Sequence, residues 1–133
     1  MKVLLDTNAY TGFKRGHLEV VDRLRRSGGV LLSTIVAGEL LFGFHHGARF
    51  ERNRAELEAF LDRPEVSLLP VSLATADRFG RISAALRRKG RPLPTNDVWI
   101  AAHTMESGAE LLSFDEHFAA IDGLVWTRLA AAR

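Results

Sequence analysis

Short apolar runs alternate with longer helix-like segments along this chain, and this alternation limits the folds that it can adopt. Each run is bounded by polar or turn-forming residues, as buried strands are. The expected strands are residues 2–5, 30–32, 66–71, 110–113 and 124–127. Strands that alternate with helices pair in parallel, and helices then cover both faces of the sheet. The sequence therefore predicts an α/β fold with a mainly parallel sheet.

The segments between these runs carry apolar residues at helical spacing, with capping residues or helix breakers at their ends. The expected helices run from about Leu18 to Gly28, from Ser33 or Thr34 to about His46, through Leu57 and Phe60 to Pro64, from Ser72 to Gly90 and from Thr95 to Gly108. In the first of them, Leu18, Val21 and Leu24 are expected to face the core. The Asp6-Thr7-Asn8 segment is expected to be a cap or turn after the first strand.

The composition is that of an ordinary globular protein, with 133 residues, of which 47% are hydrophobic and 26% charged. We expect one domain over residues 1–133. The chain has no cysteine, which excludes disulfides, cysteine-based metal sites and thiol nucleophiles. The first residues lack the long apolar stretch of an export signal, so a cytoplasmic location is expected.

Arginine carries nearly all the positive charge, because lysine occurs only at Lys2, Lys14 and Lys89. The formal net charge is only +2. Guanidinium groups bind phosphates in a bidentate manner, which favours a nucleic acid as the partner. The alternative for any single arginine is a solvated helix face.

Two acidic residues follow expected strands directly. Asp6 comes after Val3-Leu4-Leu5, and Asp115 comes after the strand at residues 110–113. Ligands of parallel α/β sheets bind beyond the carboxyl ends of the strands, so the fold brings both acids to the functional edge. Each acid taken alone is more often a turn or cap residue.

Glu39 and Asp97 are acids in less ordinary positions. Glu39 lies in a helix that is apolar on most sides, where a carboxylate is costly unless it is paired, hydrogen-bonded or bound to a metal. The alternative is a salt bridge to an arginine from elsewhere. Asp97 lies in the first turn of its expected helix, where N-capping is the usual role of an acid. Thr95 can serve as that cap, which leaves Asp97 free to point outward.

Four acids at one edge form a set of hard oxygen ligands, which suits Mg²⁺ or Mn²⁺ better than zinc. Such ions activate water for phosphodiester cleavage. The like charges are expected to raise the pKa of at least one of the carboxyls. The phosphate-binding, dinucleotide-binding and serine-hydrolase glycine motifs are missing, as is the zinc-hydrolase motif. The histidines, His103 and His117 among them, are therefore assigned to capping and packing.

Four motifs along the chain resemble those of the PIN domain, in the same order. They are Leu4-Leu5-Asp6-Thr7-Asn8, Gly38-Glu39-Leu40, Thr95-Asn96-Asp97 with Ile100-Ala101-Ala102, and Ser113-Phe114-Asp115-Glu116-His117-Phe118. Each motif alone is weak, but the ordered set within one small domain is specific. The layout is most similar to VapC-type ribonuclease toxins of toxin–antitoxin pairs, and the resemblance covers essentially the whole chain.

The resemblance implies a three-layer α/β/α sandwich with a five-stranded sheet and a Mg²⁺- or Mn²⁺-dependent endoribonuclease that cleaves RNA. Its acidic positions, expected to be both catalytic and metal-binding, fall on Asp6, Glu39, Asp97 and Asp115. Its neighbouring polar positions, which orient carboxylates or water, fall on Thr7, Asn8, Asn96 and Ser113. The expected partners are a second copy in a homodimer and a cognate antitoxin protein. The alternatives are a PIN-type nuclease of RNA processing or DNA repair, and a non-catalytic nucleic-acid-binding PIN-like domain.

Two further groups of residues are expected to contact partners. The candidate RNA-binding residues, just upstream of the Asp97 helix, are Arg87, Arg88, Lys89 and Arg91. The helix around Glu39 has more apolar residues than one buried stripe requires. Its excess apolar residues, expected either to line an antitoxin groove or to be buried in the core or a homodimer interface, are Leu40, Leu41, Phe42 and Phe44.

Overall fold

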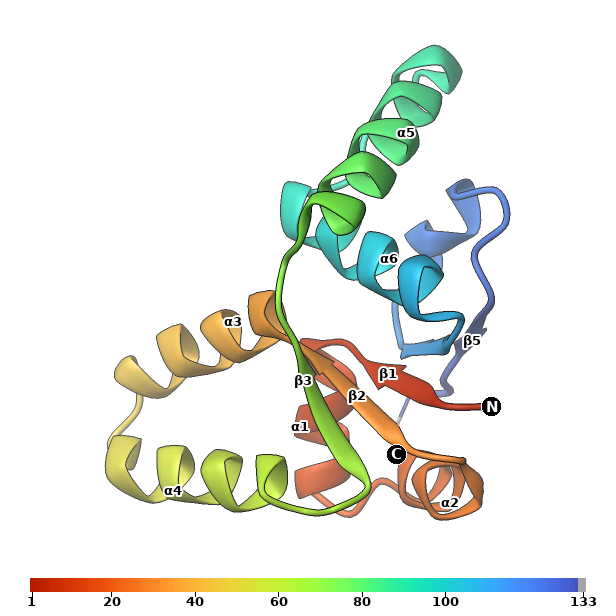
Figure 1. Cartoon of the computed structure of the whole chain (residues 1–133). Helices are drawn as coiled ribbons and strands as arrows, with labels where there is room; N and C mark the ends of the chain where they lie inside the picture. Colours follow the sequence, from red (N-terminus) through yellow and green to blue (C-terminus); the bar gives the residue numbers. More distant parts are fainter. Residues whose placement is uncertain (132–133) are drawn as a thin grey trace.

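The five strands found within residues 1–131 join one parallel sheet. The computed structural model describes residues 1–131, and the strand order is β3-β2-β1-β4-β5 (Figure 1). The strands are β1 (Val3–Leu5), β2 (Val30–Ser33), β3 (Val66–Leu69), β4 (Glu110–Ser113) and β5 (Trp126–Arg128). Every neighbouring pair is parallel, which confirms the expected sheet.

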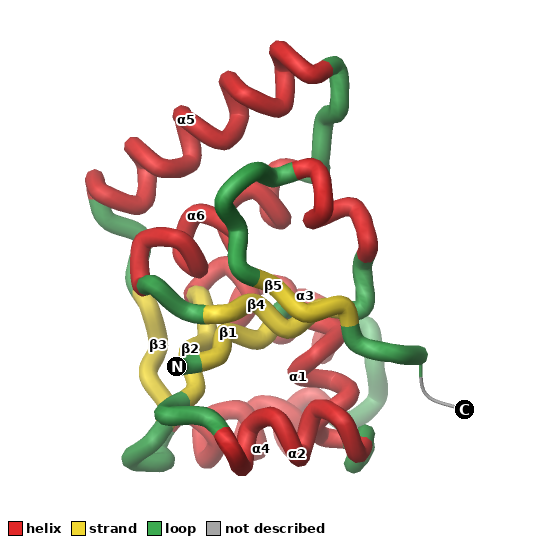
Figure 2. The backbone as a smooth tube through the Cα atoms, turned by 90° about the vertical axis from the view of Figure 1, so that its right-hand side faces the viewer, coloured by secondary structure: helices red, strands yellow, loops and turns green. Residues whose placement is uncertain are grey.

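The helices cover both faces of this sheet. They are α1 (Thr7–Lys14), α2 (Leu18–Arg26), α3 (Thr34–His45), α4 (Phe50–Leu61), α5 (Leu73–Lys89) and α6 (Thr95–Ser107), with a short 3₁₀ helix η1 (Glu116–Ala120). Helices α1, α2 and α4 lie on one side, and α5 and α6 lie on the other (Figures 1 and 2). This is the expected three-layer sandwich. Within residues 1–131, the helices are too short or too polar to cross a membrane.

Helix α1 begins where the sequence predicts only a cap or turn. Asp6 does cap it, because its Oδ1 accepts a hydrogen bond of 2.8 Å from the backbone N–H of Ala9. The segment contains threonine, asparagine and glycine, which have weak helix propensity, so the sequence alone does not predict this helix. Burial of Ala9 and Tyr10 against the sheet stabilises the helix instead.

Two details of the predicted helices are wrong. Helix α2 buries Val20 completely and leaves Leu18 84% exposed, because the helix begins at Leu18 and turns this side chain outward. Helix α6 is preceded by Pro94, and Thr95 is its first helical residue rather than its cap. Among the described residues no side chain caps α6, so Asp97 lies in a first turn whose N–H groups lack a side-chain acceptor.

The central strands form the core and position the site. All three residues of β1 are buried, and so are Leu111 and Leu112 of β4. The chain passes from β1 to β2 and β3 on one side and then crosses to β4 on the other side of β1. The crevice between the ends of β1 and β4 is therefore the switch point of the topology, where parallel sheets bind ligands.

Replacement of a side chain at the centre of this core tests its contribution to stability. We expect Leu111→Ala, at a position that is fully buried, to lower the free energy of unfolding by about 2–5 kcal/mol, since it leaves a cavity. Urea denaturation measures the change. Leu18→Ala is the control on the exposed face and should stay within about 0.5 kcal/mol of the parent. Equal effects of the two substitutions would contradict this assignment of the core.

Candidate active site

A cavity of about 740 Å³ opens at the carboxyl end of the sheet, and the four predicted acids line it. Asp6 follows β1, Asp115 follows β4, and Asp97 lies in the first turn of α6. Glu39 comes from the middle of α3, which packs against α1 and α4 and also against α6. The fold therefore brings together acids from distant parts of the chain.

Asp6 is the most buried of these acids, with 7% of its surface exposed. The pKa of Asp6 is raised to about 6, mainly by burial, and the charges of Asp97 and Asp115 act in the same direction. Hydrogen bonds from Ser113 and from the backbone N–H of Ala9 lower the pKa but do not cancel the effect of burial. The pKa of an acid in this group is raised, as the sequence predicts, but the main cause is burial of Asp6 rather than repulsion between like charges.

Glu39 is held by two polar neighbours rather than by an arginine. The Thr7 hydroxyl donates a hydrogen bond to Oε1 of Glu39, and Nδ2 of Asn96 donates one of 3.1 Å to Oε2. Among the described residues, Glu39 forms no ion pair. The alternative of a salt bridge to an arginine is therefore wrong for this structure, and both carboxylate oxygens are fixed at the cavity wall.

Asp97 is partly buried, with 23% of its side chain exposed. Burial raises the pKa of Asp97, and the charges of Glu39 and Asp115 act in the same direction. The His117 side chain opposes this effect. A cation bound between these acids would lower the pKa of Asp97 again.

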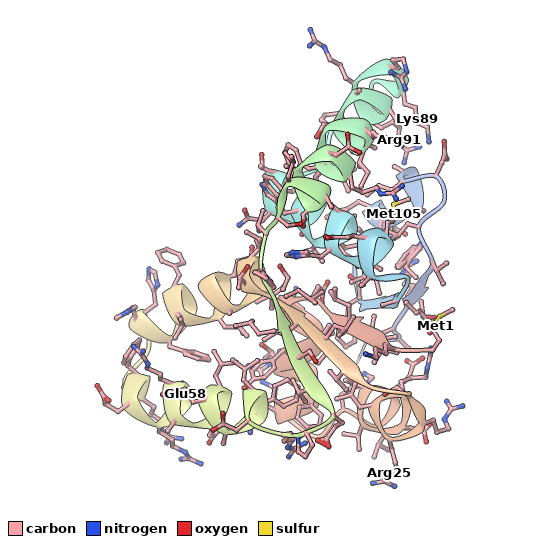
Figure 3. All side chains as sticks on the ribbon, viewed as in Figure 1. Met1, Arg25, Glu58, Lys89, Arg91 and Met105 are labelled. Atoms are coloured by element: carbon pink, nitrogen blue, oxygen red, sulfur yellow. The ribbon has the colours of Figure 1, made fainter. Side chains whose placement is uncertain are left out.

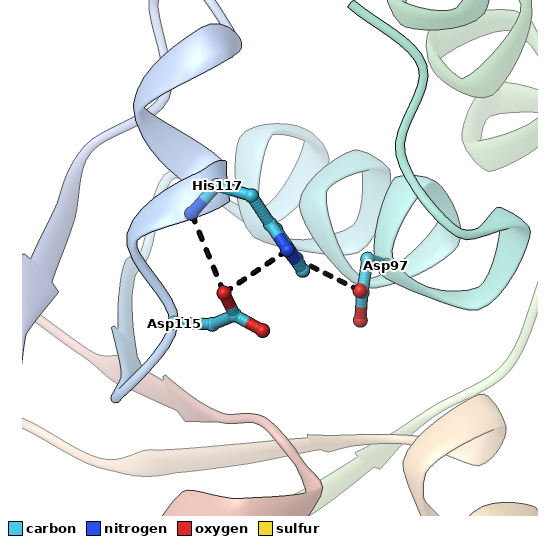
Figure 4. A group of neighbouring side chains, drawn as sticks. All are labelled: Asp97, Asp115 and His117. Carbon is cyan, nitrogen blue, oxygen red and sulfur yellow. Dashed lines mark hydrogen bonds and ion pairs between the residues drawn. The ribbon is translucent and has the colours of Figure 1, made fainter.

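His117 completes the group, although the sequence assigned it to capping or packing. Its Nδ1 lies 3.0 Å from Oδ1 of Asp115, and its Nε2 lies 2.9 Å from Oδ2 of Asp97 (Figure 4). In the sequence, the feature that indicates a role for His117 at the site is its position two residues after Asp115, just beyond β4. The start of η1 turns its ring toward the acids. The ring is half-buried between the two carboxylates.

The four predicted polar residues also lie at this edge. Thr7 and Asn96 hold Glu39, as described above, and Asn8 lines the cavity. Ser113 is fully buried, hydrogen-bonds to the Asp6 carboxyl, and accepts a bond of 3.0 Å from the backbone N–H of Asp115. These contacts orient the carboxylates of Glu39 and Asp6 and fix the backbone of Asp115.

The donor set fits a divalent cation of the Mg²⁺ or Mn²⁺ class. Carboxylate oxygens dominate it, and such ions prefer oxygen ligands. One ligand atom from each of Asp97, Asp115 and His117 lies within 4.8 Å of the others. Burial of Asp6 disfavours its charged form, a cost that a bound cation would offset.

The candidate RNA-binding residues lie apart from the cavity. Arg87, Arg88 and Lys89 form the last turn of α5, and Lys89 and Arg91 lie toward its outer end (Figure 3). None of these described residues lines the acidic cavity. Lys89 is engaged elsewhere, since its Nζ lies 2.8 Å from Oδ1 of Asp122 and 2.8 Å from the carbonyl oxygen of Ala120.

The apolar residues of α3 divide between core and surface. Leu40 is buried, Leu41 and Phe44 are half-buried, and Phe42 is 68% exposed at the rim of the cavity. Complete burial of all four in the core of one chain is therefore wrong. Phe42 leaves an aromatic ring beside the acids.

Comparison with known proteins identifies the family. Residues 3–124 match the PIN domain. Ribonuclease VapC2 of Haemophilus influenzae is 36% identical over 115 residues, which cover 85% of this chain and 86% of that protein. The tRNA(fMet)-specific endonuclease VapC of Shigella flexneri is 33% identical over 110 residues, which cover 81% of this chain and 82% of that protein. The chain therefore belongs to the PIN-domain family, and its relatives there are VapC ribonucleases.

Solved structures agree with this assignment. DNA-bound VapBC of Salmonella typhimurium has a chain with a TM-score of 0.84 and 28% identity, covering 96% of this chain and 97% of that one. VapBC2 of Rickettsia felis, bound to a promoter DNA fragment, has a TM-score of 0.85 at 24% identity and covers 98% of this chain and 100% of that one. At this identity, the similarity to the Rickettsia felis structure shows a shared fold.

The raised pKa of Asp6 predicts that the metal-free protein loses stability as pH rises. The contribution of Asp6 is fully present below the unfolded value of 3.8 and is lost as pH rises through about 6. In chelator at neutral pH, Asp6→Asn should therefore raise the free energy of unfolding by about 2–3 kcal/mol, because asparagine is uncharged and still caps a helix.

Urea melts from about pH 4 to 8 measure this difference, which should vanish at the acidic end. Asp62→Asn, on an exposed residue after α4, is the control and should change stability by less than about 0.5 kcal/mol. A destabilised Asp6→Asn protein at neutral pH would contradict the burial argument.

Proposed function

We propose that this protein is a metal-dependent endoribonuclease that acts as the toxin of a toxin–antitoxin pair. The observation that carries the proposal is the convergence of Asp6, Glu39, Asp97 and Asp115 on one cavity at the switch point of the sheet. Sequence relatives named as VapC ribonucleases support the same activity. The chain is proposed to form one PIN domain over residues 1–133.

The four acids are proposed to hold Mg²⁺ or Mn²⁺ and the RNA backbone at the cavity. When bound, the cation supplies positive charge beside the scissile phosphate and lowers the pKa of the attacking water. Asp6 and Asp97 are the most direct ligand candidates, because both carry raised pKa values that a cation would lower. Thr7 and Asn96 keep Glu39 turned toward the cavity, and Ser113 orients Asp6.

The proposed partners are an antitoxin protein and a second copy of this chain. Support comes from the solved VapBC structures that share the fold. Exposed Phe42 places an aromatic ring of α3 at the rim of the cavity. An antitoxin segment that packs on Phe42 would cover the acids, which is a direct route to inhibition.

A cleavage assay on purified RNA, with chelator and then with Mg²⁺ or Mn²⁺, tests the proposed activity. We expect cleavage with metal only. Asp97→Asn should lower the cleavage rate at least about 100-fold. Loss of a residue that hydrogen-bonds to a metal ligand costs about 10–100-fold, and loss of the ligand itself should cost no less. Asp62→Asn is the matched control on an exposed acid and should cut at the parent rate.

Thermal melts of the same proteins separate catalysis from folding. Because the pKa of Asp97 is raised, the metal-free Asp97→Asn protein should melt at an equal or higher temperature than the parent. Added metal should stabilise it less than it stabilises the parent. A near-normal cleavage rate in Asp97→Asn, or no cleavage by the parent with either metal, would refute the proposal. The second result would favour a non-catalytic PIN-like domain.

The arginines in the last turn of α5 and just after it are proposed to bind the RNA backbone outside the cavity. Replacement of Arg87, Arg88 and Arg91 by glutamine should weaken RNA binding and flatten its logarithmic salt dependence by about 0.7 for each phosphate that the variant no longer neutralises. Lys89→Gln should have a smaller effect, because Lys89 is already paired with Asp122. Binding titrations at several salt concentrations measure the RNA affinity and its salt dependence for both variants. An unchanged slope in the triple variant would assign the cluster to a solvated helix end.

A further inference from the structure

His117 presents a nitrogen that is shielded from solvent to the acids. This atom, Nε2, lies 2.9 Å from Oδ2 of Asp97. The other nitrogen, Nδ1, lies 3.0 Å from Oδ1 of Asp115. Each nitrogen of the ring therefore faces a carboxylate oxygen, and Nε2 is the one shielded from solvent beside Asp97.

The imidazole of His117 can carry a proton on either nitrogen, and a carboxylate oxygen faces each of them. When a proton on Nδ1 donates to Asp115, Nε2 can present its lone pair beside Oδ2 of Asp97. A divalent cation that takes the place of a proton on Nε2 would bind both of these atoms.

The spacing of the two atoms fits one cation that binds both. Two ligands at right angles on an ion with bonds of about 2.1 Å lie about 3.0 Å apart. The distance from Nε2 of His117 to Oδ2 of Asp97 is 2.9 Å. A carboxylate that accepts the Nδ1 proton while Nε2 binds metal is the usual support of a metal-bound histidine.

We infer that His117 is itself a ligand, through Nε2, of the divalent cation held by Asp97, and that Asp115 orients its imidazole. This inference rests on the proposed function, because it concerns the metal of the same site. An imidazole ligand suits transition-metal ions, whereas Mg²⁺ prefers oxygen ligands alone. With carboxylates supplying the remaining protein ligands, the site selects Mn²⁺ over Mg²⁺.

Electron paramagnetic resonance of Mn²⁺ bound to the full chain tests the inference without reference to catalysis. The signal of free Mn²⁺ gives the affinity, competition with Mg²⁺ gives the preference, and electron spin echo modulation detects a nitrogen bound to the ion. The parent protein should bind Mn²⁺ more tightly than Mg²⁺ and should show coupling to an imidazole nitrogen.

His117→Gln should remove the nitrogen coupling and weaken Mn²⁺ binding by about tenfold or more. Its Mg²⁺ affinity should change much less, so the preference for Mn²⁺ should fall. His45→Gln is the matched control, because His45 is an exposed histidine of α3 that stacks on Phe50 outside the cavity lining. It should keep the coupling and both affinities.

The outcomes separate this inference from the proposed function. Mn²⁺ that binds the parent without nitrogen coupling would overturn the role of His117, while the acidic metal site would stand. An unchanged preference for Mn²⁺ in folded His117→Gln would do the same. Failure of the parent to bind either ion would overturn both. If His117→Gln does not fold, as judged by circular dichroism, the coupling in the parent decides alone.

Discussion

The burial of the Asp6 carboxyl is the constraint on which the rest of the site depends. This group is 7% exposed at the end of a fully buried strand, and burial raises its pKa to about 6. Three further acids line the same cavity, so the charged state that function requires is costly in the metal-free protein. Such a site is stable at neutral pH only with help from nearby donors or a cation.

Local structure supplies part of that help. Asp6 caps α1 and Asp97 lies in the first turn of α6, so both carboxylates lie at helix N-termini, where the helix dipole stabilises negative charge. Thr7 and Asn96 donate hydrogen bonds to Glu39 from the first turns of the same two helices. These contributions are modest, and the raised pKa values of Asp6 and Asp97 show that they do not offset burial.

The parts of this fold that apolar periodicity controls could be predicted from the sequence, whereas those that tertiary contacts control could not. Strands β1 and β2 each contain three consecutive apolar residues, and β4 has Leu111 and Leu112 at its centre, so the sequence pattern predicts buried parallel strands there. Helix α1 has weak propensity and forms because Ala9 and Tyr10 pack on the core. The contact of His117 with Asp97 joins residues from α6 and η1, and the sequence shows only that His117 closely follows Asp115.

Strand register is the last link between the sequence and this site. Leu5 of β1 pairs with Leu112 of β4, so the next residues, Asp6 and Ser113, come side by side as the two strands end. Ser113 can then hydrogen-bond to the Asp6 carboxyl and accept from the backbone N–H of Asp115. A shift of one residue would turn the side chains of one strand to the opposite face and separate these groups. The same apolar pairs that form the core therefore also align the acids, and this coupling explains how such a short sheet holds a demanding site.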